Sequence, residues 1–336
     1  MGGPDPLGRK ARRPVIVLVT GASGFLGHAV AAELVSAGHD VRTLQRRASG
    51  VDGATDVLGS ITDPRIVAQA TDGADGVVHL AAKVSLAGRP EEFRAINVEG
   101  TRTVLDAAER AGVSRFVHVS SPSVAHAGSA LAGVGAEPAD PRRARGEYAR
   151  TKAEAELLAL ARDSASMHVV AVRPHIVWGP GDTQLVARVV ERARAGRLPL
   201  LDGGTALIDS TYIDNAATGI RAALDRAAEA HGRAFVLTNG EPRPVGDLLA
   251  GICLAAGVQP PRWSIPAWLG RATGSVIERV WAILPGTDEP PMTRFLAEQL
   301  STAHWFDQRD TRRSLEWTPA VSLDEGLRRL AADYAR

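Results

Sequence analysis

The stretch "PVIVLVTGASGFLG", residues 14–27, joins an apolar run to three regularly spaced glycines. Residues 14–20 are rich in β-branched side chains without polar alternation, which is typical of a strand buried on both faces of a parallel sheet. Gly21, Gly24 and Gly27 then lead into an apolar helix that ends near Gly38. A glycine loop between such a strand and a helix lets a diphosphate approach backbone N–H groups. The stretch therefore predicts a dinucleotide-binding unit.

The alternation of strand and helix continues through the first half of the chain. Strands are predicted at 40–45, 75–82, 115–121 and 168–174, and helices at 64–71, 91–112 and 148–163. Because parallel strands are joined by right-handed crossovers, this order predicts an α/β fold with a Rossmann-type doubly wound parallel sheet. We expect three parts: a flexible N-terminus at 1–13, a cofactor-binding Rossmann domain at 14–178, and a smaller, mostly C-terminal substrate lobe at 179–336 with segments that return to the Rossmann core.

Composition excludes several classes of function. The chain has 336 residues and a formal net charge of +1, so no overall electrostatic field attracts nucleic acid. Its single cysteine, Cys253, excludes an internal disulfide, and its nine histidines lack a metal-ligand spacing, so we expect no metal site. The apolar run at 14–20 is too short for a signal peptide followed by a cleavage site, and we expect a cytoplasmic protein.

Residues 265–284, "IPAWLGRATGSVIERVWAIL", predict an amphipathic helix. Three charged residues interrupt the apolar sequence and argue against a membrane span: Arg271, Glu278 and Arg279. The apolar side chains of one face are Trp268, Leu269, Val276, Val280, Trp281 and Leu284. Burial of this face in the core is the favoured interpretation, and contact with an apolar ligand or with a membrane surface is the alternative.

Tyr148 and Lys152, in "YARTK", are spaced by one helical turn and so share a helix face. A cation beside a phenol stabilises the phenolate and lowers its pKa toward the working pH, which makes the tyrosine a usable acid or base at a carbonyl group. A surface pair is the alternative for an isolated Tyr-x-x-x-Lys. Here the pair follows "VSSPSV", residues 119–124, at the end of a predicted strand.

Together, "TGASGFLG" at 20–27, "VSSPSV" and "YARTK" resemble the extended branch of the short-chain dehydrogenases/reductases. The resemblance implies that Tyr148 is the acid or base, that Lys152 orients the cofactor ribose, and that Ser121 binds the substrate oxygen, with Ser120 and Ser123 as alternatives. It assigns Asn97, in "INVEGT", either a proton relay or a structural polar contact. Dimerisation through helices of the cofactor lobe is common in the family.

The resemblance also implies the cofactor contacts. An acid normally follows the second strand of NAD-specific members, but this chain has Gln45, Arg46 and Arg47 there, which favours the 2′-phosphate of NADP(H) over NAD(H). Exposed arginines without a ligand are the alternative. The expected cofactor-binding residues are Gly21, Ser23, Gly24, Phe25, Leu26, Gly27, Gln45, Arg46, Arg47, Ser60, Ile61, Leu80, Ala81, Ala82, Lys83, Lys152, Pro174, Ile176 and Val177.

The second half of the chain bears on the substrate. "LIDSTYIDN" at 207–215 lacks the polar residues that hold a sugar nucleotide in family members. "SSPSV" at 120–124, "RPHIVWGPGD" at 173–182 and "PPMTRFLAEQ" at 290–299 are instead similar to the 3β-hydroxysteroid dehydrogenase-like group, and most of all to its 2-alkyl-3-oxoalkanoate reductases. This resemblance implies NADPH-dependent reduction of the keto group of a lipophilic β-keto acid, with Tyr148 as proton donor.

Four residues are candidates for contact with the substrate: Ser123, His126, His175 and Arg294. Ser123 is an alternative contact to the substrate oxygen, and the other three are candidates for its carboxylate, with a structural role as the favoured interpretation of each. A 3β-hydroxysteroid dehydrogenase is the alternative function. A nucleotide-sugar epimerase or dehydratase is disfavoured, and so is a non-catalytic NADP(H) sensor, because both Tyr148 and Lys152 are present.

Overall fold

The computed structural model describes residues 15–85, 88–126, 128, 130–283 and 293–336, so the predicted flexible segment 1–13 lies outside the described residues. A seven-stranded sheet with strand order β12-β7-β5-β4-β1-β2-β3 forms its centre, and every neighbouring pair is parallel. The strands are β1 (Ile16–Thr20), β2 (Asp40–Gln45), β3 (Thr55–Leu58), β4 (Gly76–His79), β5 (Arg115–Val119), β7 (His168–Pro174) and β12 (Arg233–Leu237). The predicted doubly wound parallel sheet is confirmed, with β3 as a strand that the sequence did not predict.

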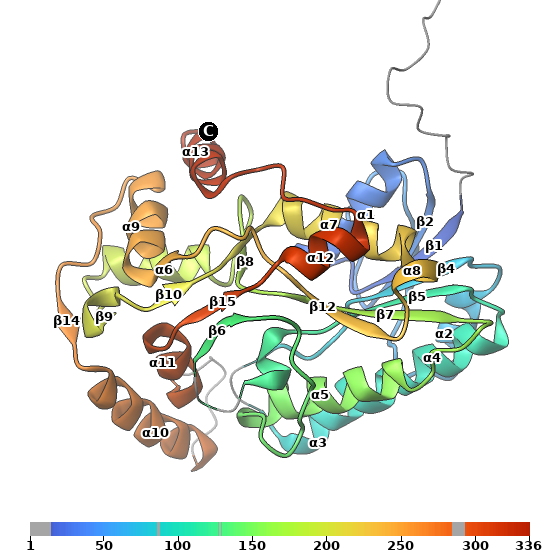
Figure 1. The fold of residues 1–336 in the computed structure, drawn as a ribbon, viewed down its shortest axis with the longest axis horizontal. Coiled ribbons are helices and arrows are strands. Elements are labelled where there is room, and N and C mark those ends of the chain that lie inside the picture. Colours follow the sequence, from blue (N-terminus) through green and yellow to red (C-terminus); the bar gives the residue numbers. More distant parts are fainter. Residues whose placement is uncertain (1–14, 86–87, 127, 129, 284–292) are drawn as a thin grey trace, which may run out of the picture.

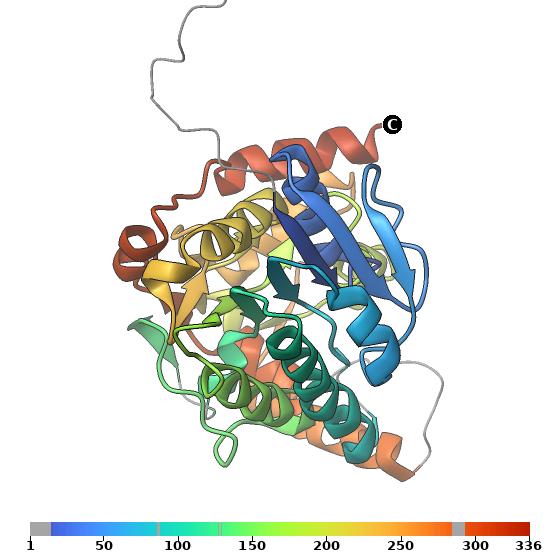
Figure 2. The same cartoon turned by 90° about the vertical axis from the view of Figure 1, so that its right-hand side faces the viewer.

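Helices cover both faces of this sheet (Figures 1 and 2). One face carries α1 (Phe25–Ser36), α7 (Ile213–Asp225), α8 (Ala227–Ala230) and α12 (Arg309–Leu315). The other carries α2 (Pro64–Thr71), α3 (Pro90–Phe93), the π-helix η1 (Arg94–Gly100), α4 (Thr101–Arg110) and α5 (Gly146–Leu160). Each side encloses its own cluster of buried hydrophobic residues, because alternate side chains of each strand point to opposite faces.

Local signals in the sequence set several helix ends. The Asp63 carboxylate accepts from Arg65 N at 2.9 Å and so caps α2. Gly38, with φ +84°, follows the last turn of α1 in the left-handed conformation expected there. The predicted helix at 91–112 is continuous but changes to π geometry between α3 and α4. A π-helix is often found at a functional site, and this one carries Asn97.

The remaining elements form a second part of the molecule beside the large sheet (Figure 1). A four-stranded sheet has the order β13-β10-β15-β6. Its strands are β6 (Leu131–Val134), β10 (Leu207–Ile208), β13 (Arg243–Pro244) and β15 (His304–Phe306). Two short parallel pairs lie nearby: β8 (Val177–Trp178) with β11 (Thr211–Tyr212), and β9 (Leu200–Leu201) with β14 (Ser264–Ile265). The helices are α6 (Val186–Arg194), α9 (Val245–Ala255), α10 (Ala267–Ile283), α11 (Arg294–Ser301), α13 (Leu323–Tyr334) and the short η3 (Asp202–Gly204). The short helix η2 (Pro122–Ala125) follows β5 and packs against α5.

The chain passes between these two parts more than once. Strand β12 and helix α7 come from beyond residue 178 yet belong to the large sheet and its covering layer, whereas β6 comes from the first half and pairs with β15. The boundary at residue 178 stays a prediction.

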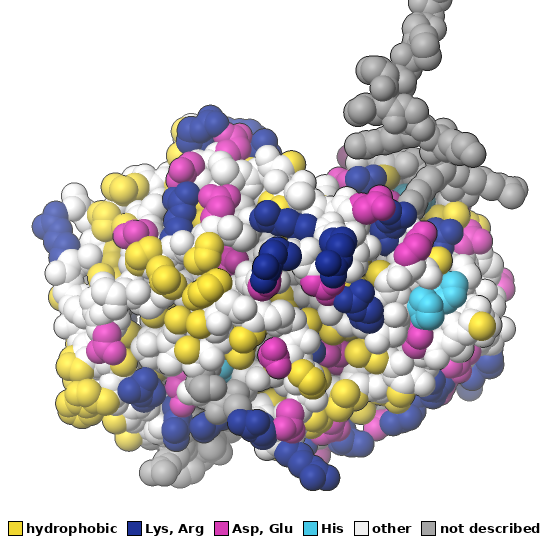
Figure 3. Space-filling model, in the orientation of Figure 1, with side chains coloured by type: hydrophobic (Ala, Val, Ile, Leu, Met, Phe, Trp, Pro, Cys, Tyr) yellow, Lys and Arg dark blue, Asp and Glu magenta, His cyan; other side chains and the backbone are white. Residues whose placement is uncertain are grey.

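Helix α10 packs through small residues and exposes large apolar ones. A Cβ on Gly274 would lie 2.6 Å from Arg294 N, so the helix meets the start of α11 backbone to backbone. Trp268, Leu269 and Val276 are 65%, 39% and 57% exposed. The core interpretation is therefore wrong for these three side chains, and the predicted Val280, Trp281 and Leu284 lie outside the described side chains. Hydrophobic side chains gather over α10 at the lower left of Figure 3. No helix in the described part of the chain is long and apolar enough to cross a membrane.

Candidate active site

The glycine loop between β1 and α1 is closely packed against neighbouring backbone. Gly21 has φ +81°, and a Cβ on it would lie 2.9 Å from Ala81 N. A Cβ on Gly27 would lie only 2.2 Å from Gly21 O, so both positions require glycine. Gly24 begins α1 without a side-chain cap, which leaves the N–H groups of the first turn for an anion. This cradle fits the diphosphate of a dinucleotide.

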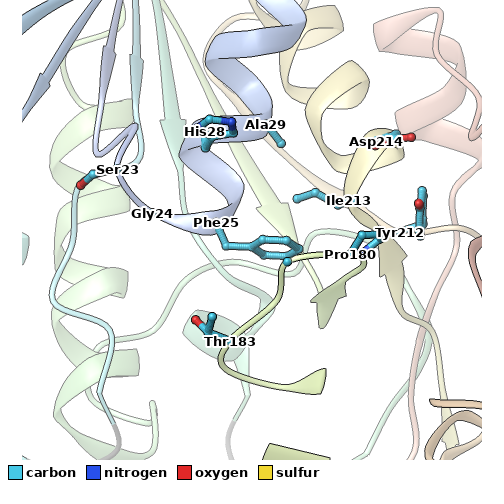
Figure 4. Close-up of a pocket in the computed structure, with 11 residues that line it drawn as sticks. Ser23, Gly24, Phe25, His28, Ala29, Pro180, Thr183, Tyr212, Ile213 and Asp214 are labelled. Carbon is cyan, nitrogen blue, oxygen red and sulfur yellow. The ribbon is translucent and has the colours of Figure 1, made fainter. Parts of the chain in front are cut away.

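A cavity of about 480 Å³ opens beside this loop (Figure 4). The first turn of α1 lines one side, and residues from the other half of the chain line the rest. The Phe25 ring points toward Pro180, and Thr183 lies below them (Figure 4). Sequence reasoning missed Thr183, Tyr212 and Asp214 in this cavity, although the turn "WGPGD" at 178–182 lies close to the first of them.

At the end of β2, Gln45 stands where NAD-specific members have an acid, but a carboxylate from a neighbouring strand, that of Asp56, lies beside it. Gln45 is buried, and its Nε2 donates to Asp56 Oδ1 at 3.1 Å. The other carboxylate oxygen of Asp56 accepts from Ser49 N at 3.0 Å. Burial raises the pKa of Asp56, but the hydrogen bonds from Thr43, Ser49 and Gln45 outweigh that effect and lower it. Sequence reasoning missed Asp56 because it lies on the unpredicted strand β3.

Arg46 and Arg47 follow Gln45 directly, and both side chains are exposed. Within the described ranges neither guanidinium forms an ion pair. The N–H donors of both guanidinium groups are therefore accessible to a ligand at the end of β2.

The segment after β4 is held from two sides. Thr20 Oγ1 accepts from Leu80 N and from Ala81 N, each at 3.1 Å. Further along, the Asn97 side chain forms paired hydrogen bonds with Lys83, accepting from its N at 2.7 Å and donating to its O at 3.2 Å. Asn97 Nδ2 also donates to Thr151 Oγ1 at 3.0 Å, which links this segment to α5.

Two other predicted cofactor residues lie between β3 and α2. The Ser60 hydroxyl is 2.8 Å from that of Thr62. Ile61 is buried against Gly100 of η1, where a Cβ would lie 2.6 Å from Ile61 Cδ1. Ala82, the remaining residue of the "HLAA" segment, is half-buried.

Ser121 and Tyr148 come together at the end of β5. Ser121 Oγ accepts from Ser123 Oγ at 3.0 Å and from Ser123 N at 3.3 Å. Tyr148 lies in the first turn of α5. Burial raises the pKa of Tyr148 to about 12, and a hydrogen bond with the Ser121 side chain opposes this increase. The three side chains form one polar group at the carboxyl end of a central strand.

Lys152 lies one turn further along α5 and is buried against β5. Its Nζ donates to Val119 O at 2.6 Å and lies 3.4 Å from His118 Nε2. Burial lowers the pKa of Lys152 to about 8, while the charge of Glu156 opposes this decrease. Burial thus favours the neutral form of both Tyr148 and Lys152.

The predicted nicotinamide segment contains strained backbone. Pro174 is buried at the end of β7, Val177 begins β8, and Ile176 between them has φ +44°. A β-branched residue in the left-handed region is a true outlier, and such strain is concentrated at ligand sites.

Two of the predicted substrate residues belong to a buried histidine cluster. His304 Nε2 lies 3.4 Å from His126 Nδ1, and the rings of His175 and His304 are 6.0 Å apart. His175 Nδ1 donates to Asp209 O at 2.6 Å. Sequence reasoning missed His304, for which no local signal exists. Arg294 is at the exposed start of α11, where its Nε donates to Glu298 Oε1 at 2.9 Å.

Comparison with known proteins gives consistent relationships. The model of the NAD dependent epimerase/dehydratase family matches residues 17–238. A 2-alkyl-3-oxoalkanoate reductase of Stenotrophomonas maltophilia is 41% identical over 327 residues, covering 95% of this chain and 99% of the relative. A 3-beta-hydroxysteroid dehydrogenase of Mycolicibacterium neoaurum is 30% identical over 332 residues, covering 93% of this chain and 89% of the relative.

A solved structure has the same fold over nearly its whole length. A short-chain dehydrogenase/reductase superfamily protein from Agrobacterium tumefaciens with bound NAD has a TM-score of 0.74 and 25% identity, covering 95% of this chain and 97% of that one. The seven-stranded parallel sheet agrees with these relationships. The chain belongs to the NAD dependent epimerase/dehydratase family, the extended short-chain dehydrogenases/reductases, and is an NAD(P)-dependent oxidoreductase.

Proposed function

We propose that this protein reduces the keto group of a lipophilic β-keto acid of the 2-alkyl-3-oxoalkanoate type, with NADPH as the reductant. The observation that carries the proposal is the contact between Ser121 and Tyr148 at the end of β5, one helical turn from Lys152. The substrate class is supported by the relative that is 41% identical and named 2-alkyl-3-oxoalkanoate reductase.

Each residue has a defined task in this reaction. The glycine loop of Gly21, Gly24 and Gly27 would hold NADPH, and the chemistry this group would supply is a hydride for the carbonyl carbon. The Ser121 hydroxyl donates a hydrogen bond to the carbonyl oxygen, and Tyr148 gives that oxygen its proton as the C=O double bond becomes a single bond. The positive charge of Lys152 stabilises the phenolate that remains, an effect opposite in sign to that of burial, which raises the Tyr148 pKa. Asn97 keeps Lys83 and α5 in place through the hydrogen bonds described above.

The preference for NADPH over NADH rests on the end of β2. Arg46 and Arg47 are exposed and can form charge-assisted hydrogen bonds with a 2′-phosphate. Gln45 is turned toward Asp56, so Asp56 already has hydrogen-bond donors on both carboxylate oxygens. The carboxylate that could otherwise accept from the ribose hydroxyls of NAD(H) is therefore engaged.

The exposed face of α10 is the proposed contact with lipid. Trp268, Leu269 and Val276 present apolar surface, and tryptophan is a typical residue of a membrane interface. A protein that acts on a two-chain lipophilic acid gains by meeting its substrate at a membrane surface. Co-sedimentation with phosphatidylcholine vesicles tests this contact, and Trp268→Ser with Leu269→Ser should abolish it. Dimerisation stays a prediction that light scattering can test.

A steady-state panel of three substrate classes tests the proposed function. NADPH oxidation is measured with β-keto acids and their 2-alkyl forms over a series of acyl lengths, with 3-ketosteroids, and with UDP-sugars. The catalytic efficiency should rise with acyl length until the site is full, because each buried CH₂ contributes about 0.8 kcal/mol. The matching β-hydroxy acids should be oxidised with NADP⁺ in the reverse direction.

Other outcomes of the same panel would change the assignment. Preference for the steroid would favour a 3β-hydroxysteroid dehydrogenase, the activity named for the relative that is 30% identical. Turnover of UDP-sugars would refute the lipophilic substrate. Binding of NADPH without turnover of any class would contradict an enzymatic role for Tyr148.

A further inference from the structure

A row of polar side chains crosses the centre of the large sheet directly below its carboxyl edge. In the parallel register Thr20 of β1 is opposite His79 of β4, and His79 is opposite His118 of β5. All three are buried, at no more than 1% exposure. On each strand the residue two positions earlier (Leu18, Val77 and Phe116) belongs to the hydrophobic cluster between the sheet and helices α2, α4 and α5. Side chains two positions apart point to the same face of a strand, so the row lies on the side of the sheet where α5 packs.

The hydrogen bonds of His79 determine its tautomer. Thr20 Oγ1 already accepts from two backbone N–H groups, so its own proton goes to His79 Nδ1, which is 2.8 Å away. The proton of His79 must then be on Nε2, which donates to Thr101 Oγ1 at 3.0 Å. Thr101 in turn donates to Asn97 O at 2.6 Å. His79 is therefore a neutral ring with both nitrogens in use, and it has no lone pair left for Lys152.

His118 differs from His79 because one of its nitrogens faces a cation. An ammonium group has three protons to donate and no lone pair. Val119 O accepts one proton of Lys152, and His118 Nε2, at 3.4 Å, is the acceptor in line for the second. No further hydrogen-bond partner of Lys152 Nζ is found among the residues that the structure describes. Two of the three donors of Lys152 are thus directed to β5, and the third is left for a ligand.

We propose that His118 is a positioning residue for Lys152, whose ammonium it orients by accepting one N–H at Nε2 so that another N–H faces the active site. A charged Lys152 requires the His118 proton to be on Nδ1, which is buried and has no hydrogen-bond partner in the described ranges. The pair therefore couples the tautomer of one residue to the charge of the other. His118 touches neither substrate nor cofactor, so its effect on turnover rests on the function proposed above.

The other charged and titratable groups around Lys152 come from three elements. On α5 these are Tyr148, one turn before Lys152, and Glu156, one turn after it. Glu156 is paired with Arg173 of β7. On β4 the neighbour is His79, whose ring centroid is 5.6 Å from that of His118. Since His79 is held neutral and Glu156 is paired, His118 is the neighbour whose lone pair can respond to Lys152.

The sequence makes a direct test practical, because the chain contains only three lysines: Lys10, Lys83 and Lys152. Selective ¹³C labelling of the lysine side chains gives three Cε signals, and the Lys152 signal is assigned by its loss in Lys152→Arg. The pH titration of this signal in the cofactor-free protein reports the proton affinity of Lys152 without any substrate. The Lys83 signal is an internal control, since Lys83 pairs with Glu92 away from β5.

The variants of His118 differ in whether their side chain can place a hydrogen-bond acceptor at the position of Nε2. His118→Gln can place an amide oxygen close to the position of Nε2, whereas His118→Asn is too short and His118→Leu has no acceptor. His168→Gln, at the opposite end of neighbouring β7, is the matched control. We expect His118→Asn and His118→Leu to lower the proton affinity of Lys152 about three- to tenfold, the loss of one hydrogen bond of ordinary strength, because 3.4 Å is long for a charge-assisted contact. His118→Gln should retain the affinity within about twofold. Circular dichroism verifies folding, and the Gln–Asn pair carries the comparison if the leucine variant is unfolded.

Turnover provides a second readout. Lys152 acts while protonated, so a lower proton affinity should move the alkaline limb of the kcat–pH profile to lower pH in His118→Asn, with rescue in His118→Gln. An unchanged Lys152 titration in both His118→Asn and His118→Leu, or an equal loss in His118→Gln, would overturn the proposal. If the unmodified protein turns over no β-keto acid but the titrations differ as expected, the proposed function fails and the positioning role of His118 stands.

Discussion

Arg173 Nε donates to Glu156 Oε2 at 2.9 Å, and both side chains are almost completely buried. Arg173 also donates to Glu137 O at 2.6 Å. Arg173 is the penultimate residue of β7, and Glu156 is one turn beyond Lys152 on α5. This ion pair therefore connects α5, the helix that carries Tyr148 and Lys152, to β7, the strand that ends at Pro174.

Removing one partner of this pair should strongly destabilise the fold. Glu156→Gln leaves the buried Arg173 charge uncompensated, and we expect the free energy of unfolding to fall by about 3 to 5 kcal/mol. Urea unfolding followed by circular dichroism measures the change. The exposed Asp310, which pairs with Arg233 and Arg313, is the control, because Asp310→Asn should cost less than about 1 kcal/mol. Equal losses in the two variants would contradict this view of the pair.

Tyr148→Phe should separate chemistry from binding. The ring remains and only the hydroxyl is lost, so we expect NADPH affinity to change little while kcat falls about 100- to 10,000-fold, the usual contribution of a general acid. Fluorescence titration measures the first quantity and stopped-flow absorbance the second. Tyr334→Phe makes the same change on the exposed last helix and should leave both unchanged. Turnover that survives in Tyr148→Phe would require another proton donor.

The cofactor preference should depend on Arg46 and Arg47. The double change Arg46→Ala with Arg47→Ala removes two charged donors, and we expect the preference for NADPH over NADH to narrow by about 1 to 3 kcal/mol. Dissociation constants for both cofactors, measured at fixed ionic strength, give the value. Arg313→Ala, a change of another exposed arginine on α12, should leave the ratio unaltered. Equal affinities for the two cofactors in the unmodified protein would rule out the 2′-phosphate contact.

The free energy of unfolding should fall as the solution becomes acidic, because histidines that are buried and neutral in the folded protein take up protons once unfolding exposes them. Burial lowers the pKa of His175 to about 4 and those of His79 and His304 to about 3, and it places that of His118 well below its usual range. Between pH 6.5 and 4 the unfolded chain therefore binds more protons than the folded one. Each such histidine lowers the unfolding free energy by up to about 1.4 kcal/mol per pH unit in this window.

Two carboxyls, Asp209 and Glu33, act in the opposite direction over part of this range, because burial raises the pKa of each. Burial raises the pKa of Asp209 to about 6, so the stability that its protonated form contributes is present below pH 4 and is lost as the pH rises through 6. Four histidines oppose these two carboxyls, and the net stability should rise with pH. Urea unfolding from pH 4.5 to 7.5 measures the slope, which His304→Gln should reduce and His168→Gln should leave largely unchanged. A stability that is flat over this range would show that the buried histidines are already charged in the folded protein.

Periodicity and spacing within short segments were enough for the large sheet and for part of the site. The apolar run at 14–20, the glycines after it and the capping residue Asp63 act on backbone conformation within a few residues, so their effects can be predicted without knowledge of distant neighbours. The Tyr148 and Lys152 spacing is of the same kind, because one helical turn brings the two side chains to one face wherever the helix lies.

Other features depend on segments that only folding brings together. Asp56 engages Gln45 because β3 pairs with β2, and His304 joins His126 because β15 pairs with β6. The outward direction of Trp268 follows from the backbone contact between Gly274 and α11, which a hydrophobic pattern cannot indicate. His118 meets Lys152 only because α5 packs on the face of β5 that carries this imidazole. Local sequence sets dihedral angles and faces, whereas the partner of a buried polar atom is decided by the contacts that exclude water from it.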